Sequence, residues 1–349
     1  MHKYTNGLYT QLTKIAVVGA SGYAGGEILR LLAGHPKFEI SYITAGSNAG
    51  ELITNLHPQL TSFAGRKFET TNVEMINKCE LTFIALPHGE SAKLVSQVDK
   101  SVKIVDLGAD FRLQSSDSWK KYYGGEYAGS WVYGLPELVD HKEISKSTQV
   151  SNPGCYATAI ALSVAPVLSV IDSEDVVVVA ASGTTGAGRS TKVNLIGSEV
   201  MNNLTSYKFG GVHQHTPEIE EVLSKVGKKH VKISFTPILA PMPRGILATV
   251  TAKLNDKSSS ETVRDLFSNY YKTSKFVTLL PASSMPMTSA VLGSNNAQIQ
   301  VAVDEHVGRV VISTAIDNLG KGAAGQAIQN ANLMCDFPED LGLQNLGVR

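Results

Sequence analysis

Residues Lys14–Ala33 read KIAVVGASGYAGGEILRLLA, and they carry the clearest local signal in the chain. Lys14–Val18 is a short run rich in β-branched residues, three glycines follow at a spacing of three, and residues 26–33 are apolar at helical spacing. A second strand-like run comes next at Phe38–Ile43. A strand, a glycine turn, a helix and a strand in this order predict a βαβ unit.

The spacing of the glycines suits a dinucleotide phosphate. In such a loop Gly19 takes the tight turn, Gly22 lets the backbone approach a pyrophosphate, and Gly25 allows the helix to pack closely on the strand. The start of the helix supplies free N–H groups and a favourable dipole. A bare structural turn is the alternative, but the flanking strands and helix favour cofactor binding. The residues expected to contact the cofactor here are Gly19, Ser21, Gly22, Tyr23 and Ala24.

The end of the second strand indicates which dinucleotide is bound. An NAD enzyme is expected to carry Asp or Glu there for the ribose 2′-hydroxyl. The sequence instead continues Thr44-Ala45-Gly46-Ser47-Asn48, without an acidic residue. Small hydroxyl side chains such as Ser47 leave room for a 2′-phosphate, so we expect NADP, although no Arg or Lys lies in this segment.

Outward from this unit, further strand-like runs at Leu81–Leu86 and Lys103–Leu107 flank a helical stretch at Glu90–Val98. This alternation predicts an α/β fold with a Rossmann-type, doubly wound parallel sheet. After about residue 150 the pattern becomes rich in strands, at 176–181, 231–237, 245–253 and 297–304, after a helix at 156–168. We expect an α+β domain on a mixed or antiparallel sheet. The predicted divisions are an extension at 1–13, a cofactor domain at 14–152 that the helical C-terminal segment (about 317–349) completes, and a catalytic and oligomerisation domain at 153–316.

Composition excludes several classes of protein. The 349 residues include 31 Lys+Arg and 31 Asp+Glu, so the formal net charge is zero, which argues against a nucleic-acid or anionic-membrane partner. No apolar run is long enough to span a membrane. The three cysteines are too few and too scattered for a disulfide framework or a metal site. Because residues 1–13 are polar and lack the features of a secretory signal, we expect a cytoplasmic protein.

Cys155 is the candidate nucleophile. It lies between the turn Ser151-Asn152-Pro153-Gly154 and a helical run. A thiol at a helix N-terminus has its thiolate stabilised by the dipole and the free N–H groups, so we expect a lowered pKa. The alternative is a buried, inert cysteine. Cys79 and Cys335 fit that description well, and the local pattern alone leaves both possibilities open for Cys155.

Several motifs occur together and in order. They are the glycine loop at 19–25, LGADFR at 107–112, YGLPE at 133–137, SNPGCYAT at 151–158, GTTGAGR at 183–189, HQHTPEI at 213–219 and DNLGKGA at 317–323. This set resembles the N-acetyl-gamma-glutamyl-phosphate reductases of arginine biosynthesis, from residue 14 to about 335. The resemblance implies NADPH-dependent reduction of an acyl phosphate to N-acetylglutamate semialdehyde with phosphate release. It also implies a fold and cysteine chemistry like those of aspartate-semialdehyde dehydrogenase. One departure is Gln214, where the family usually has Arg.

The resemblance and the chemistry together suggest roles for the remaining polar residues. A cysteine thioester route needs an acid/base near neutral pH, and His213 and His215 are the candidates, with His213 preferred. The phosphate and the α-carboxylate of the substrate need anion anchors, for which arginines suit. The residues assigned to substrate binding are Arg112, Asn152, Glu218 and Arg244. Those assigned to the nicotinamide side of the cofactor are Ser182, Gly183, Gly186 and Asn318.

Four other functions stay open. One is a dehydrogenase without a covalent step, and another is a redox-sensing regulatory protein that binds NADP. The close rivals are the related reductase of lysine biosynthesis, which acts on a carrier-bound acyl phosphate, and aspartate-semialdehyde dehydrogenase. Balanced charge favours a free small-molecule substrate over an acidic carrier. The resemblance and the apolar strands of the second domain predict a homodimer or homotetramer.

Overall fold

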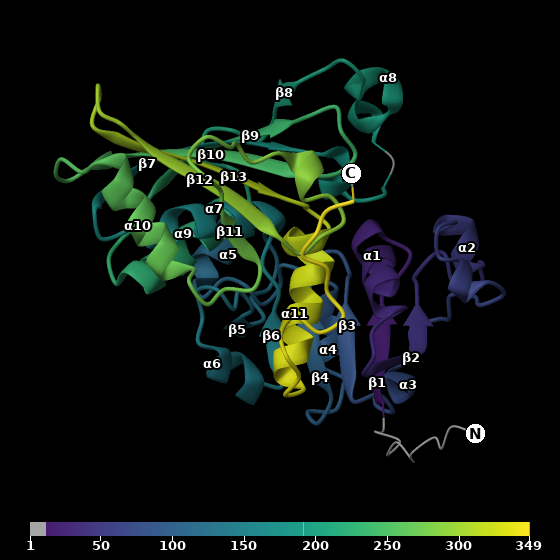
Figure 1. Cartoon of the computed structure of the whole chain (residues 1–349). Helices are drawn as coiled ribbons and strands as arrows, with labels where there is room; N and C mark the ends of the chain where they lie inside the picture. The colour runs from purple at the N-terminus through teal and green to yellow at the C-terminus, as the bar shows by residue number, and fades with distance from the viewer. Residues whose placement is uncertain (1–11, 191, 349) are drawn as a thin grey trace, which may run out of the picture.

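The computed structural model describes residues 12–190 and 192–348, so most of the predicted extension at 1–13 lies outside the described residues. The chain forms two sheets that lie side by side, each with its own buried core (Figure 1). The α/β fold with a Rossmann-type domain and a second α+β domain is confirmed.

The first sheet has six strands in the order β2-β1-β3-β4-β6-β5, and every adjacent pair is parallel. Its strands are β1 (Thr13–Val18), β2 (Phe38–Thr44), β3 (Leu81–Ile84), β4 (Lys103–Asp106), β5 (Val132–Tyr133) and β6 (Gln149–Ser151). The strand order reverses between β1 and β3. In open α/β sheets, ligands bind at the carboxyl ends of the strands at such a switch point.

Seven helices accompany this sheet among the described residues. They are α1 (Tyr23–Leu32), α2 (Ile53–Leu56), α3 (Val73–Ile76), α4 (Ser91–Val95), α5 (Ser116–Tyr122), α6 (His141–Lys146) and α11 (Gly325–Met334). The last of these comes from the far end of the chain. Ala327, Ile328, Ala331 and Met334 of α11 are fully buried in the core that α1 and the first strands form. The C-terminal segment is therefore part of the first domain's packing (Figure 1).

The second sheet has seven strands in the order β11-β12-β13-β10-β7-β9-β8. They are β7 (Ile171–Ser182), β8 (Thr205–Ser206), β9 (Ile233–Leu239), β10 (Ile246–Leu254), β11 (Val277–Leu279), β12 (Ala297–Asp304) and β13 (Arg309–Ile316). The pairs β7–β9 and β11–β12 are parallel and the others are antiparallel. The sheet is therefore mixed.

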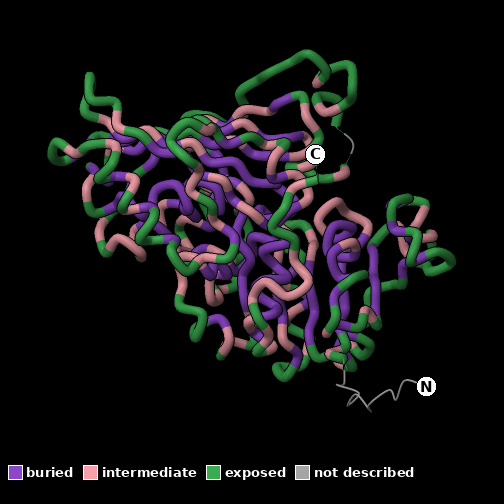
Figure 2. Tube along the Cα trace, viewed as in Figure 1, coloured by how far each residue is buried: buried purple, intermediate pink, exposed green. Residues whose placement is uncertain are grey.

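Helices cover one face of the second sheet. They are α7 (Cys155–Val164), α9 (His215–Gly227) and α10 (Ser260–Tyr270), which pack beneath the strands in Figure 1. On the other face the central strand β7 exposes Val177 and Val179, at 36% and 42% of their full surface. The connection that carries α8 (Gly197–Val200) and β8 is also largely exposed, as Figure 2 shows. None of the helices in the described ranges is long and apolar enough to cross a membrane.

The sequence prediction located most of the central elements and missed several peripheral ones. The predicted helix 156–168 is α7 followed by a 3-10 turn at Ala165–Val167, and the predicted helix after residue 322 begins as a π-helical turn at Gly320–Ala324. The missed elements are strands β5, β6, β8, β11 and β13 and helices α2, α3, α5, α6, α8, α9 and α10. Strand β13 pairs with both β10 and β12, so the centre of the second sheet was incomplete in the prediction.

Candidate active site

The glycine loop joins β1 to α1 at the carboxyl edge of the first sheet. Gly19 has a φ of +77°, and a Cβ there would lie 2.4 Å from the carbonyl oxygen of Ala85. A Cβ at Gly25 would lie 2.6 Å from the carbonyl oxygen of Gly19. Gly22 is the N-cap of α1, and no side chain caps that helix. The first amides of α1 therefore have no side-chain cap and lie beside a glycine-rich loop with small side chains, which fits a dinucleotide phosphate.

The other residues predicted to contact the cofactor surround this helix start. Ser21 precedes the N-cap, and Tyr23 and Ala24 begin α1. Ser47 is exposed beyond the end of β2. The structure also brings the backbone of Glu69 alongside Thr44, where Ala45 N–H donates to the Glu69 carbonyl oxygen at 3.1 Å. This acidic residue was missed because it is distant in sequence from the strand end that it borders.

Cys155 is the first residue of α7, directly after the N-cap Gly154. The π-helical turn packs against it, since a Cβ at Gly322 would lie 2.8 Å from the Cβ of Cys155. Only glycine fits this approach without displacing Cys155. The thiol thus lies where α7 meets the turn that leads into α11 of the first domain.

The expected lowering of the Cys155 pKa is wrong for the free protein. Burial raises the pKa of this thiol to about 11, which outweighs the lowering by the backbone N–H groups at the start of α7 and by the Arg112 charge. The helix start was readable from sequence, whereas the desolvation comes from residues distant in sequence that pack over it. Cys155 is therefore a neutral thiol near pH 7.

The two histidines have different surroundings. Nε2 of His215 would lie 2.5 Å from a Cβ at Gly154, so its imidazole lies against the N-cap of the Cys155 helix. His213 packs edge-on against Tyr156, Tyr207 and Phe235, with ring centroids 5.1 to 5.9 Å apart. The Nδ1 of His213 accepts the backbone N–H of His215 at 3.0 Å. The geometry thus favours His215, and the preference for His213 as acid/base finds no support.

Both imidazoles are neutral near pH 7. Burial lowers the pKa of His215 to about 3, with further lowering by the Arg112 charge. Burial also lowers the pKa of His213 to about 2, and His215 adds to the effect. An uncharged imidazole has a nitrogen free to accept a proton, but a pKa lowered to about 3 makes His215 a weak base in the free protein. What suits His215 to exchange a proton with the thiol is its position against Gly154.

Arg112 and Glu218 form a buried ion pair next to the nucleophile. Their side chains are 8% and 1% exposed, and Nη1 of Arg112 lies 3.4 Å from Oε2 of Glu218. Oε1 of Glu218 accepts the backbone N–H of Gly154 at 2.7 Å and the Tyr133 hydroxyl at 2.8 Å. Glu218 was assigned to substrate binding, but these contacts make it a positioning residue for the turn before Cys155.

Arg112 retains some capacity to bind an anion. Its guanidinium donates to the carbonyl oxygens of Asn152 and Leu107 at 2.8 and 2.7 Å, and to Glu218. These bonds use three of the five guanidinium N–H groups. Nη1 would lie 2.9 Å from a Cβ at Gly154, so the arginine borders the Cys155 turn directly.

Asn152 has a buried amide that is engaged within the protein. Its Nδ2 donates to the Ala323 carbonyl oxygen at 3.1 Å, and its Oδ1 accepts from Asn330 at 3.1 Å. Its backbone N–H donates to the carbonyl oxygen of Asp106 at 2.7 Å. Asn152 therefore ties the turn before Cys155 to the π-helical turn and to α11.

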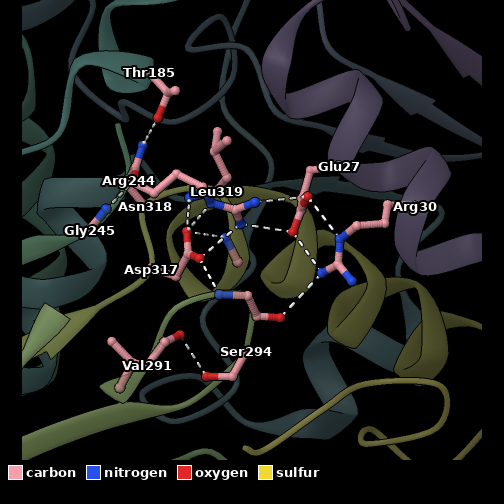
Figure 3. Close-up of polar contacts among 12 residues, drawn as sticks. Glu27, Arg30, Thr185, Arg244, Gly245, Val291, Ser294, Asp317, Asn318 and Leu319 are labelled. Atoms are coloured by element: carbon pink, nitrogen blue, oxygen red, sulfur yellow. Dashed lines mark hydrogen bonds and ion pairs between the residues drawn. The ribbon is translucent and has the colours of Figure 1, made fainter. Parts of the chain in front are cut away.

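Arg244 lies in a different cluster from Arg112. Figure 3 shows its guanidinium between Glu27 of α1 and Asp317, which follows β13. Nη1 and Nη2 donate to the two carboxylate oxygens of Glu27 at 3.1 and 2.8 Å, and Nε donates to Asp317 at 3.1 Å. With two carboxylates already bound, Arg244 is an interdomain ion-pair residue, and these contacts give no support to its predicted role as a substrate anchor.

The residues predicted to lie near the nicotinamide come from two segments, the turn after β7 and the segment after β13, which hydrogen bonds join. Oδ1 of Asn318 accepts the Gly245 N–H at 2.7 Å, and its Nδ2 donates to the Thr185 hydroxyl at 3.0 Å, as Figure 3 shows. A Cβ at Gly183 would lie 2.8 Å from the backbone nitrogen of Arg244. A Cβ at Gly186 would lie 3.1 Å from Oγ of Ser182. Asn318 therefore shapes this turn through its amide.

Sequence reasoning missed two residues with evident roles near these sites. Tyr133 donates its hydroxyl to Glu218, and burial raises its pKa well above the ordinary value. Arg189 reaches from the turn after β7 to the ring of Tyr23 at the start of α1. Both lie in motifs that were recognised, YGLPE and GTTGAGR, and this was the available signal.

Comparison with known proteins places this geometry in a family. Residues 14–147 match the semialdehyde dehydrogenase NAD binding domain, and residues 155–318 match the semialdehyde dehydrogenase dimerisation domain. Among solved structures, aspartate semialdehyde dehydrogenase II complexed with ASA from Vibrio cholerae is similar, with a TM-score of 0.70, 15% identity and coverage of 94% of this chain and 99% of that chain. Aspartate semialdehyde dehydrogenase with NADP from Candida albicans gives a TM-score of 0.68 at 16% identity, over 93% of this chain and 99% of that one. At such identities the likeness concerns the fold alone.

Curated relatives are much more similar in sequence. The N-acetyl-gamma-glutamyl-phosphate reductase of Acidothermus cellulolyticus is 52% identical over 338 residues, covering 96% of this chain and 98% of that protein. The enzyme of the same name from Pseudarthrobacter chlorophenolicus is 48% identical over 337 residues, with the same coverage. With this identity along nearly its whole length, and with a cysteine at the start of a helix between two semialdehyde-dehydrogenase domains, the chain belongs to the N-acetyl-gamma-glutamyl-phosphate reductase family.

Proposed function

We propose that this chain reduces N-acetyl-γ-glutamyl phosphate to N-acetylglutamate 5-semialdehyde with release of phosphate, in arginine biosynthesis, through a thioester on Cys155. The observation that carries the mechanism is the placement of Cys155 at the start of α7 with the neutral imidazole of His215 against the preceding Gly154. A thiol nucleophile and a base in this relation are what acyl transfer requires.

Attack on the acyl carbon begins from a neutral thiol. His215 accepts the thiol proton at Nε2, which requires the ring to carry its own proton on Nδ1. The bond between Sγ of Cys155 and the acyl carbon forms, the carbon–oxygen bond to phosphate breaks, and the proton leaves with the phosphate. Two N–H groups of Arg112 remain to hold that anion beside Cys155.

Reduction then occurs at the thioester. When bound, NADPH would supply the hydride for this reduction. The carbon–sulfur bond breaks and the semialdehyde is released. The Cys155 thiolate that remains regains a proton through His215. The backbone N–H groups at the start of α7 stabilise this thiolate while it is charged.

We propose NADPH in preference to NADH. The support is the segment directly after β2, where Ser47 is exposed and none of the residues Ala45–Asn48 is acidic. A carboxylate introduced there repels a 2′-phosphate and accepts from a free 2′-hydroxyl, so Ser47→Asp should shift kcat/KM toward NADH. We place the enzyme in the cytoplasm, where such biosynthetic reductions draw on NADPH.

We also propose a homo-oligomer, with a small-molecule substrate and no nucleic-acid or membrane partner. The exposed valines of β7 lie on the uncovered face of the second sheet, in the part of the chain that matches a dimerisation domain. A second copy on this face would bury them. Light scattering should give at least twice the 37.3 kDa of one chain. A monomer at micromolar concentration would contradict this assignment.

The test of the reaction is a steady-state assay in the oxidative direction, with NADP, phosphate and N-acetylglutamate semialdehyde. Aspartate semialdehyde is the control substrate. Cys155→Ser should abolish turnover and leave NADPH affinity nearly unchanged, because a hydroxyl lacks the acidity and softness to attack and leave. The matched controls Cys79→Ser and Cys335→Ser should stay active. Near-normal turnover by Cys155→Ser would contradict the covalent route. So would mass spectrometry that finds no acyl adduct on Cys155 after the enzyme is mixed with the acyl phosphate in the absence of NADPH.

A further inference from the structure

Arg189 connects the second domain to the cofactor helix of the first. It follows the turn Gly183–Gly188, and its guanidinium carbon lies 4.9 Å from the ring centroid of Tyr23, the first residue of α1. Nη1 donates to the carbonyl oxygen of Leu56 at 2.9 Å, and Nη2 donates to Nδ1 of His57 at 3.4 Å. An arginine from the catalytic domain thus lies at the start of the helix that follows the glycine loop.

The charge of Arg189 has no acidic partner in the part of the chain that the structure describes. The ion pairs found there involve other residues. Its Nε is buried and makes no hydrogen bond to any described residue. The guanidinium therefore carries a donor that no described residue satisfies, and its charge is not neutralised within the described ranges.

The neighbours of Arg189 hold its guanidinium in place. His57 donates from Nε2 to the carbonyl oxygen of Ala20 at 2.9 Å, which leaves Nδ1 to accept from Arg189. A Cβ at Gly26 would lie 2.3 Å from Cε1 of His57, so the imidazole is wedged against α1. The Arg189 guanidinium therefore contacts Tyr23 and His57 at the start of α1, a helix that no side chain caps.

We propose that Arg189 binds the diphosphate of the dinucleotide cofactor, as a binding residue that the catalytic domain supplies to the glycine loop. A planar guanidinium pairs with phosphate oxygens through two parallel hydrogen bonds, and the open helix start adds amide donors on the same anion. The inference rests on the proposed use of NADPH.

This placement has a structural consequence. The glycine loop belongs to the first domain, whereas the turn Gly183–Gly188 belongs to the second. Arg189 directly follows this turn. A diphosphate bound by both the α1 amides and Arg189 therefore holds the two domains together at the cofactor. Cofactor binding should then stabilise the wild-type protein against heat more than it stabilises a variant without this cation.

The experiment measures equilibrium binding of NADPH and NADH by calorimetry in the full chain and in Arg189→Gln. The Kd should rise about 10- to 100-fold for both dinucleotides, the worth of a hydrogen bond to a charged group. Arg189→Lys should recover part of the affinity, because it keeps the charge and loses the fork. The matched control is Arg66→Gln, since Arg66 also stacks on a ring, that of Phe63, and donates to a backbone carbonyl.

Each outcome decides the assignment. A Kd within twofold of the wild-type value for both dinucleotides would overturn it. A rise for NADPH alone would also overturn it and would place Arg189 at the 2′-phosphate. Wild-type protein that binds neither dinucleotide would overturn the proposed cofactor and this inference together. Tyr23→Leu, which removes the aromatic face against which Arg189 lies, should weaken binding of both dinucleotides, and unchanged affinity in this variant would count against the stacked arrangement.

Discussion

Arg244 and Glu27 join the two domains through a bidentate ion pair. The guanidinium donates to both oxygens of a carboxylate that is only 4% exposed, between residues 217 positions apart in sequence. Glu27 belongs to α1, whereas Arg244 lies two residues before the start of strand β10. Asp317, with no exposed side-chain surface, completes the cluster on the far side of the arginine.

Removing the arginine should therefore destabilise the protein strongly. Arg244→Gln leaves the carboxylates of Glu27 and Asp317 buried without this partner, and breaking a buried ion pair typically costs about 3–5 kcal/mol. Arg30→Gln is the matched control, because Arg30 also binds Glu27 but its side chain is 37% exposed, and such pairs contribute less than about 1 kcal/mol. Equilibrium unfolding in urea measures both. Equal losses in the two variants would contradict the assignment of Arg244 as the interdomain residue.

The two histidines should separate in kinetics. His215→Asn removes the base next to Gly154 and should lower kcat about 10²–10⁴-fold, the usual worth of a positioned acid/base. His213→Asn should have a smaller effect, because His213 acts through the hydrogen bond that its Nδ1 accepts from the His215 backbone. Rate measurements under saturating substrate compare them. A larger loss in His213→Asn would restore His213 as the acid/base and leave the thioester route intact.

Much of the cofactor site was predictable because its signal is local. The turn, the close approach and the helix packing of Gly19, Gly22 and Gly25 depend on a strand and a helix that adjoin them in sequence. The position of Cys155 at a helix start was predictable for the same reason. In each case a short stretch specifies its own backbone conformation.

The partners of the charged residues were not predictable in this way. Arg112 and Glu218 are separated by 106 positions, and nothing in either motif indicates that they pair with one another. Arg112 and Arg244 were both assigned to substrate anions. In the folded protein, however, Arg244 binds two carboxylates of the protein itself, Glu27 and Asp317. The prediction of a lowered Cys155 pKa was wrong for a related reason, because burial depends on elements distant in sequence that pack over the helix start.

Alkylation of Cys155 should report the raised thiol pKa directly. Only the thiolate reacts with iodoacetamide, so with a pKa near 11 the rate should rise about tenfold for each pH unit from 7 to 10. His215→Asn should leave this slope unchanged, because an uncharged imidazole does not stabilise the thiolate electrostatically. Peptide mapping after timed labelling follows the reaction. A plateau near pH 7 would instead indicate a preformed thiolate–imidazolium pair.

The same buried histidines should make the fold sensitive to acid. The pKa values of His213 and His215 are lowered to about 2 and about 3 in the folded protein, from 6.5 in an unfolded chain. As pH falls below about 6.5, the unfolded chain takes up protons at both residues and the folded protein does not. The stability is therefore complete above that pH, and the free energy of unfolding falls by about 1.4 kcal/mol per pH unit for each histidine as the pH approaches 3.

Other groups titrate in this window, so the comparison must be made between variants. Burial raises the pKa of Asp106 to about 6, which opposes the histidines, and lowers the pKa of His35 and His57, which adds to them. These groups are common to the wild type and to the double variant His213→Asn, His215→Asn, so their contributions cancel in the difference of slopes. Urea unfolding at several pH values between 6.5 and 4.5 should give a slope shallower by about two protons in the double variant. Equal slopes would mean that the two imidazoles are protonated in the folded protein as readily as in the unfolded chain.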